Sequence, residues 1–319
     1  STLSDGDSGL ASNYLLTNAA GSVSATISQK DLTISGITAE NKTYNGKQDA
    51  VVSTVGLIRD GLIANDELTV ATTGMFIDKH ASSTAKTVNL TSTYSGADAR
   101  NYNITDQATT TASIAKAALT ISGITAANKA YDGSRIATVS TAGVAKSGLF
   151  GDDQVTVTAT GLFSDKNASN GKTVTLSSTV SGADAGNYNI TGQASTLANI
   201  TKREISVAPA TAASKTYDGL TLAQVTAGAL KGLVAGESLV ASATGYFTSA
   251  DVGTNKLVNT KTTIANGTNG LASNYTLTNA TGTTTANITK ANYVTIGAAA
   301  NAMLMSSKPV VAQKQLAKR

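Results

Sequence analysis

Few side chains in this sequence are suited to nucleophilic or acid–base chemistry. The chain has a single histidine, His80, and no cysteine. No serine or carboxylate pair stands beside a base that a second group could orient, which is the arrangement that such catalysis needs. His80 corresponds to Asn167 in a similar polar stretch further along the chain, so we expect it to be solvated. We therefore expect no enzyme, no catalytic residue and no cofactor.

Carboxylates are the other residues that could bind a ligand. Asp98 and Asp184 each lie in an SGADA stretch, and Asp78 and Asp165 each precede a lysine. Calcium takes roughly six to eight oxygen ligands, and these turns offer few carboxylates at a spacing that matches no known calcium loop. We expect no metal site, and removal of divalent ions should leave the melting temperature unchanged.

A Tyr-Asp-Gly tripeptide occurs at residues 131–133 and again at residues 217–219. It is either a binding site or a half-buried tyrosine followed by an Asp-Gly turn, and the second interpretation needs no ligand. Earlier in the chain Asn45 replaces the aspartate, and Asn-Gly forms the same kind of turn. We favour the structural interpretation.

These stretches belong to a repeat of about 87 residues. Tyr44, Tyr131 and Tyr217 lie 87 and 86 residues apart, and a second tyrosine series, which begins at Tyr14, keeps the same period. An acidic turn recurs in phase at Asp66, Asp152 and Glu237, so several markers agree. The predicted structural signature of the repeat is Tyr44, Tyr131, Asp132, Gly133, Tyr217, Asp218, Gly219, Tyr102, Tyr188, Tyr275, Phe76, Phe163 and Phe247.

Apolar residues alternate within each repeat, which predicts short strands with one buried face. We expect an all-β fold of tandem small β-sandwich or β-grasp-like domains, arranged as an elongated rod because only about Lys116 to Ala118 separates two repeats. One helical turn is possible near Ala145 to Phe150. Six residues are expected to line the core of the second repeat: Ile121, Val157, Phe163, Leu176, Tyr188 and Ile200.

The expected domains are repeats at residues 31–117, 118–202 and 203–290. Residues 1–30 correspond to the closing strands of a repeat whose opening strands are absent, and another segment or another copy must complete them. Residues 291–319 form an aperiodic tail with a possible helix over Ala298 to Met305.

Composition excludes two classes of partner. Charged residues are 14% and aromatic residues 4% of the chain, and the net charge of +4 owes much to the last dozen residues. A nucleic-acid groove needs clustered Lys and Arg with stacking aromatics, so no nucleic-acid partner is expected. No run of about 18 apolar residues is present, so no membrane-spanning segment is expected.

Taken together, the tripeptides at residues 131–133 and 217–219, the stretch from Thr160 to Leu176 and the stretch from Ser181 to Gly192 resemble the YDG/MBG-type repeat domains of large haemagglutinin-like bacterial exoproteins. The resemblance covers residues 1–290. It implies stalk modules of secreted adhesins that are often exported by two-partner secretion, and hence an extracellular location on the bacterial cell surface.

Three functions follow as alternatives. The first is a non-enzymatic stalk of a surface adhesin that projects or links other domains. The second is a subunit of a self-assembling extracellular filament joined by strand donation, and the third is a glycan-binding, lectin-like module. The partners would be neighbouring repeats of a longer chain, other copies of the chain, or host or bacterial surface glycans.

Overall fold

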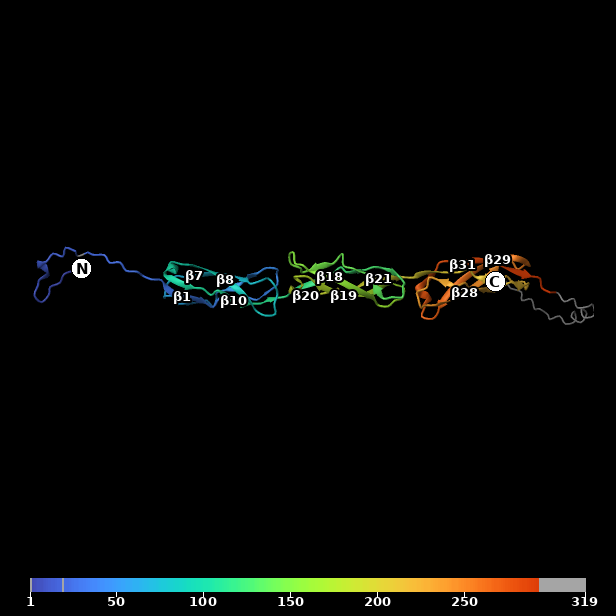
Figure 1. The fold of residues 1–319 in the computed structure, drawn as a ribbon, viewed down its shortest axis with the longest axis horizontal. Helices are drawn as coiled ribbons and strands as arrows, with labels where there is room; N and C mark the ends of the chain where they lie inside the picture. Colours follow the sequence, from blue (N-terminus) through green and yellow to red (C-terminus); the bar gives the residue numbers. More distant parts are fainter. Residues whose placement is uncertain (1, 19, 293–319) are drawn as a thin grey trace, which may run out of the picture. The chain divides into compact units, whose positions relative to one another are not determined.

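The computed structural model describes residues 2–18 and 20–292. Strands and short 3-10 turns are the only regular elements of these residues, and no helix among them is long and apolar enough to cross a membrane. β-branched Thr and Val favour extended backbone, and Gly and Asn favour turns. The predicted all-β fold of tandem small domains is confirmed, with one group of strands for each repeat (Figure 1).

In each repeat the first strand is the centre of a three-stranded sheet. It pairs antiparallel with one strand and parallel with another that begins at a tyrosine. In the order of pairing, the three sheets are β6 (Ile58–Asp60), β1 (Lys30–Ser35) and β9 (Tyr102–Thr105); β17 (Ala145–Ser147), β12 (Ala117–Ser122) and β20 (Tyr188–Thr191); β27 (Leu230–Lys231), β22 (Arg203–Val207) and β30 (Tyr275–Leu277).

A second sheet is built around a long hairpin. In the third repeat its strands β28, β29 and β31 lie side by side (Figure 1). In the order of pairing, the sheets are β10 (Thr109–Ala112), β8 (Lys86–Ser95), β7 (Thr69–Phe76) and β4 (Asp49–Ala50); β14 (Lys129–Ala130), β21 (Ser195–Thr201), β19 (Ser169–Ser181), β18 (Thr156–Phe163) and β15 (Ile136–Ala137); β24 (Lys215–Thr216), β31 (Thr281–Thr289), β29 (Gly253–Asn266), β28 (Leu239–Phe247) and β25 (Leu222–Ala223).

Short pairs complete each repeat. They are β2 (Thr38–Ala39) with β5 (Val52–Ser53), β13 (Thr125–Ala126) with β16 (Val139–Ser140), β23 (Thr211–Ala212) with β26 (Val225–Thr226), and β3 (Lys42–Thr43) with β11 (Ile114–Ala115). Four 3-10 turns each stand directly before a tyrosine: η1 (Ala11–Asn13), η2 (Ala99–Asn101), η3 (Ala185–Asn187) and η4 (Ala272–Asn274).

The two sheets of the first repeat pack face to face, as in a small sandwich. Leu32 and Ile34, two residues apart on β1, are both 1% exposed because alternate side chains of a strand point to the same face. Leu32 and Ile34 belong to a cluster of buried residues. Val70 on β7 and Leu90 on β8, both from the second sheet, pack against this cluster. Close packing between the sheets therefore forms the core of this repeat.

All six residues that were expected to line the core of the second repeat are buried, at 8% exposure or less. The helical turn expected near Ala145 to Phe150 is wrong. Residues 145–147 form β17, which pairs antiparallel with Thr120–Ser122 of β12. The local preference for a turn is outweighed here because the backbone N–H and C=O groups of residues 145–147 can pair with the edge of β12.

Successive repeats are connected by one residue. Lys116 stands between β11 and β12, and Lys202 stands between β21 and β22. The chain thus passes from the last strand of one repeat directly into the first strand of the next. Such a connection leaves few backbone dihedral angles free to reorient the two domains.

Residues 2–29 contain η1 and an isolated bridge between Gly6 and Gly9. Tyr14 is 69% exposed and Ile27 is 97% exposed. The two residues therefore do not contribute to a core in the described part of the chain. The tail from residue 293 onward, including the helix expected at Ala298 to Met305, lies outside the described residues.

The chain divides into two compact units, and the boundary passes through the second repeat. The first unit contains Ser1–Gly123, Gly143–Thr158 and Ser178–Gln193, and the second contains Ile124–Ala142, Ala159–Ser177 and Ala194–Arg319. The junction of repeats one and two lies wholly inside the first unit. The junction of repeats two and three lies wholly inside the second.

Candidate functional site: the junctions between repeats

Strand pairing brings a tyrosine from each of two repeats to the first junction. The backbone N–H of Tyr44 donates to the carbonyl of Ala115 at 2.8 Å, at the end of β11. Two residues later Ala117, the first residue of β12, lies opposite Tyr188 in the parallel pair with β20. The two rings meet edge to face, with centroids 5.4 Å apart. Because the chain runs directly from β11 into β12, these two pairings place both phenols at the same point of the junction.

A buried carboxylate, Asp153, accepts hydrogen bonds from both phenols. Its Oδ2 atom lies 2.7 Å from the Tyr44 hydroxyl and 2.6 Å from the Tyr188 hydroxyl. Lys79 of the first repeat donates its Nζ to Oδ1 at 2.9 Å, and the Asp153 side chain is 4% exposed. Three charge-assisted hydrogen bonds, two of them from the neighbouring repeat, thus meet this one group.

Asp184 and Asn187 of the second repeat extend the same contact. The Nζ of Lys79 lies 3.2 Å from Asp184 Oδ1, and the backbone N–H of Gln154 holds Oδ2 at 2.9 Å. Asn187 Oδ1 accepts the backbone N–H of Ala81 at 3.0 Å. Asn187 is 3% exposed, so its side-chain amide is buried between the two repeats.

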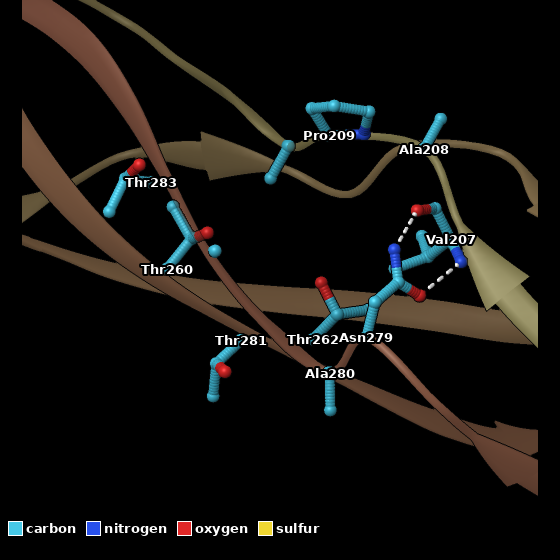
Figure 2. Close-up of a pocket in the computed structure, with 11 residues that line it drawn as sticks. Val207, Ala208, Pro209, Thr260, Thr262, Asn279, Ala280, Thr281 and Thr283 are labelled. Atoms are coloured by element: carbon cyan, nitrogen blue, oxygen red, sulfur yellow. Dashed lines mark hydrogen bonds between the residues drawn. The ribbon is translucent and has the colours of Figure 1, made fainter.

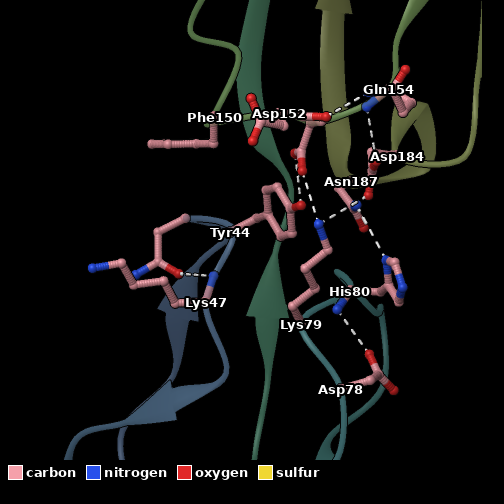
Figure 3. A network of polar contacts seen from close by, with 12 residues as sticks. Tyr44, Lys47, Asp78, Lys79, His80, Phe150, Asp152, Gln154, Asp184 and Asn187 are labelled. Carbon is pink, nitrogen blue, oxygen red and sulfur yellow. Dashed lines mark hydrogen bonds and ion pairs between the residues drawn. The ribbon is translucent and has the colours of Figure 1, made fainter.

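His80 was expected to be solvated, and the structure corrects that expectation in part. Its side chain is exposed, yet Nδ1 lies 3.3 Å from the amide nitrogen of Asn187 in the next repeat (Figure 3). The backbone N–H of His80 donates to Asp78 at 2.8 Å, which fixes the loop that presents Lys79. His80 is therefore a junction residue.

The second junction repeats this arrangement with a glutamate. Tyr131 of the second repeat donates to Glu237 Oε1 at 2.5 Å, and Tyr275 of the third repeat donates to Oε2 at 2.7 Å. Lys166 donates to Oε1 at 2.9 Å, and the Glu237 side chain is 5% exposed. The tyrosine rings are again edge to face at 5.4 Å. Asn274 again accepts a backbone N–H, that of residue 168, at 2.8 Å.

The balance of burial and hydrogen bonding keeps both carboxylates ionised. Burial alone would raise the pKa of Asp153, but the hydrogen bonds from Tyr188, Lys79 and Tyr44 outweigh it and lower the pKa. Burial would likewise raise the pKa of Glu237, but the hydrogen bonds that it accepts outweigh this effect and lower the pKa. Burial, followed by the bond to the carboxylate, raises the pKa of the Tyr188 phenol to about 12 and that of its equivalent in the third repeat to about 12.

The turn after each junction tyrosine is fixed by a lysine two positions before it. Lys129 Nζ donates to Asp132 at 2.8 Å and to two backbone carbonyls of the same turn, and it lies 5.5 Å from the centroid of the Phe163 ring. Asp132 also accepts the backbone N–H of Ser134 at 2.8 Å. Gly133 has a φ of 78°, and a Cβ there would lie 2.9 Å from a side chain of the third repeat. Glycine is needed at this position for both reasons.

A family model for the YDG domain matches residues 28–112, 115–196 and 201–286. These matches cover most of the chain. The chain belongs to the YDG domain family. No curated protein matched it.

Solved structures give only a distant likeness to these YDG repeats. The crystal structure of Drosophila N-cadherin EC1-4 has a TM-score of 0.28 and 8% identity, and the match covers 83% of this chain and 76% of that one. A structure of Drosophila N-cadherin EC1-3 has a TM-score of 0.23 and 8% identity, with 80% and 98% covered. A likeness at this level carries no argument.

The signature tyrosines take different positions in the three YDG repeats. Tyr44 and Tyr131 are at most 1% exposed at the junctions, whereas Tyr217 of the third repeat is 46% exposed. The other aromatic signature residues are all buried: Tyr102, Tyr188, Tyr275, Phe76, Phe163 and Phe247. The turn residues lie at the surface or near it: Asp132, Gly133, Asp218 and Gly219.

The acidic turn of the second YDG repeat was predicted at Asp152, but in the structure Asp153 has this role. Asp152 is exposed, whereas Asp153 binds both tyrosines. Two adjacent aspartates made the choice ambiguous in the sequence, and aligning Val155 with Leu68 would have resolved it. The sequence did not predict Lys79 and its equivalent in the second repeat as site residues, although both follow an aspartate shortly after the strand that ends at phenylalanine.

The carboxylates considered as calcium ligands have other partners in the described residues. Asp165 binds Lys172 at 2.7 Å, Asp78 binds Lys86, and Asp184 binds the lysine of the preceding repeat. No group of three or more His, Cys, Asp or Glu residues that could hold a metal ion was found in residues 2–18 and 20–292.

A hollow on the third YDG repeat lies between the start of the β22–β23 loop and strands β29 and β31 (Figure 2). Its volume is about 180 Å³, below the roughly 300 to 1,000 Å³ of common small-molecule sites. The Asn279 amide within it is already used: Oδ1 accepts the N–H of Val207 at 2.8 Å and Nδ2 donates to its carbonyl at 2.7 Å. Gln107 holds Ile37 in the same way in the first repeat, so this is a structural brace.

Proposed function

We propose that the chain is a non-enzymatic structural stalk of a secreted bacterial surface adhesin that projects or links other domains. The observation that carries this proposal is the junction network, which is built twice from equivalent residues. What the first and second repeats have in common is a pair of groups, a tyrosine and a lysine, that fixes the next repeat. Such a device suits a segment whose task is to hold its ends apart.

The chemistry of the junction carboxylates supports a structural role over catalysis. Asp153 is 4% exposed and accepts bonds from two phenols and an ammonium group, so both of its carboxylate oxygens already have partners within the protein. Its pKa lies below its ordinary value. A general base that works near neutral pH needs a carboxylate pKa raised toward 7.

Surface labelling of the producing cell tests the proposed location. An antibody raised against the repeats should label intact bacteria, and negative-stain images of the purified chain should show separate particles. Labelling that appears only after lysis would contradict the extracellular role.

The filament alternative is favoured by one observation. Tyr14, Val23 and Ile27 are 69%, 96% and 97% exposed, and strand addition by another chain would cover them. Long regular fibres in negative stain, lost when residues 291–319 are deleted, would support strand donation over the stalk. A glycan array would test the lectin alternative, for which the hollow of Figure 2 is small.

A further inference from the structure

One end of the first repeat has the groups that the second and third repeats use to receive a neighbour. The Tyr102 hydroxyl donates to Asp66 and accepts the N–H of Ile63 at 3.0 Å. The N–H of residue 67 donates to Asp98 at 2.9 Å, as that of residue 154 donates to Asp184. We refer to Ile63, Asp66, Asp98, Asn101 and Tyr102 as the receiving face.

The receiving face is open where its equivalents are covered. Asn187 and Asn274 are 3% and 1% exposed, whereas Asn101 is exposed. Asp66 and Asp98 are half-buried, and within residues 2–18 and 20–292 neither forms a salt bridge with a lysine. The equivalent faces of the second and third repeats are occupied at the two junctions, so those junctions show which groups bind such a face.

We infer that the receiving face of the first repeat binds a YDG domain that presents both a YDG-motif tyrosine and the lysine of an Asp-Lys turn. At the first junction these groups are Tyr44 and Lys79, and at the second they are Tyr131 and Lys166. A phenol and an ammonium group placed in this way would complete the three-donor set around Asp66. The inference rests on the junction geometry and is independent of the proposed stalk role.

The third repeat of this chain lacks the required chemistry. It keeps Tyr217, but Ala250 stands at the position of Lys79 and Lys166, and Asp251 stands at the position of His80 and Asn167. Docking it on the receiving face would bring a third carboxylate toward Asp66 and Asp98 with no cation between them. Like charges with no counterion disfavour that pair, so the face discriminates against a second copy joined head to tail.

Grafting tests this specificity in the context of the chain. Residues 1–29 are replaced by residues 118–202, so that Lys202 precedes Lys30 and the connection has its native length. In a matched chain they are replaced by residues 203–290. Hydrogen exchange is measured at the amides of residues 98–102, and exchange within the grafted repeat shows whether it has folded.

We expect the graft of residues 118–202 to slow exchange at residues 98–102 about tenfold or more, and the graft of residues 203–290 to leave it nearly unchanged. Ala250→Lys with Asp251→Asn in the second graft should restore the protection. Equal protection by both grafts, or none from residues 118–202 when they are folded, would overturn the inference.

Discussion

At the scale of single residues, Asp153 and Glu237 determine how the repeats are joined. A buried carboxylate is costly unless hydrogen bonds compensate for its lost hydration. Each of these two groups accepts bonds from two tyrosines and a lysine, and in each case one tyrosine and the lysine come from the preceding repeat. Separating the repeats would remove two of the three donors, the tyrosine and the lysine of the preceding repeat, and only water could replace them.

Tyr131→Phe isolates one of these bonds. It removes a hydrogen bond to a charged group and should lower the unfolding free energy by about 1.5 to 3 kcal/mol. The matched control is Tyr217→Phe, at the equivalent position, where the tyrosine is 46% exposed and little change is expected. Chemical denaturation of the full chain measures both, and equal effects would mean that the junction bond adds nothing.

The pH dependence follows from the pKa shifts. The pKa of Asp153 is lowered in the folded state, so its contribution is present above its ordinary value near 4 and is lost as the pH falls through the folded pKa. The pKa of Tyr188 is raised to about 12, so its contribution is present below an ordinary value of about 10 and is lost as the pH rises toward about 12.

Thermal stability should therefore be highest between these limits and fall on both sides. In Tyr188→Phe the late phase of tyrosinate absorbance near pH 12 should shrink. An alkaline titration identical to that of the unmodified chain would contradict the assignment.

The sequence predicted the tyrosine and phenylalanine positions but not the junction. Periodicity identifies residues that recur, and the aromatic signature recurs in phase. The partner of Tyr44 is 109 residues away in the next repeat, so no local pattern connects them. One signal was available: Ala250 replaces the lysine in the same repeat whose Tyr217 has no following repeat within the described residues.

At the scale of elements, close approach of the strands explains the glycine of the TG-x-F stretch. A Cβ on Gly161 would lie 2.7 Å from Val139 Cγ2 and 2.8 Å from Val174 Cγ1. The equivalent glycines, Gly74 and Gly245, are as closely packed. These positions therefore restrict how the hairpin of the second sheet packs.

Gly161→Ala should cost about 1 to 3 kcal/mol because it overpacks this contact. Gly186→Ala is the control, since nothing lies within 4 Å of the added Cβ and the other repeats have Arg100 and Ser273 there. Thermal unfolding of both variants compares them. A Gly161→Ala variant as stable as the control would show that the strands move apart easily.

The alternation of strand residues gives a second test at this scale. Leu176 on β19 is 8% exposed, whereas Leu197 on the paired strand β21 is 65% exposed. Leu176→Ala should cost about 2 to 5 kcal/mol, and Leu197→Ala should cost far less. Denaturant unfolding measures the difference, and similar losses would contradict the strand orientation.

The sequence predicted strands where apolar and polar residues alternate. It missed strands that form only because a neighbouring strand offers backbone partners. Leu119 and Ile121 mark β12 by their period of two. Residues 145–147 carry no such period, and their strand exists because β12 offers an open edge. Local patterns do not report that edge, which the tertiary fold creates.

At the scale of the whole molecule, one-residue connections and carboxylate networks act together. Lys116 and Lys202 limit how far two repeats can separate, and Asp153 and Glu237 select one arrangement within that limit. The central claim is that each junction holds its two repeats in one relative orientation.

Distances between spin labels test this claim most directly. The chain has no cysteine, so Ala71→Cys and Thr158→Cys place labels at equivalent exposed sites of the first two repeats, both within the first compact unit. The unmodified junction should give one narrow distance distribution, and Lys79→Ala with Asp153→Asn should broaden it while both repeats stay folded. A distribution in the unmodified chain as broad as that of the junction variant would contradict the account.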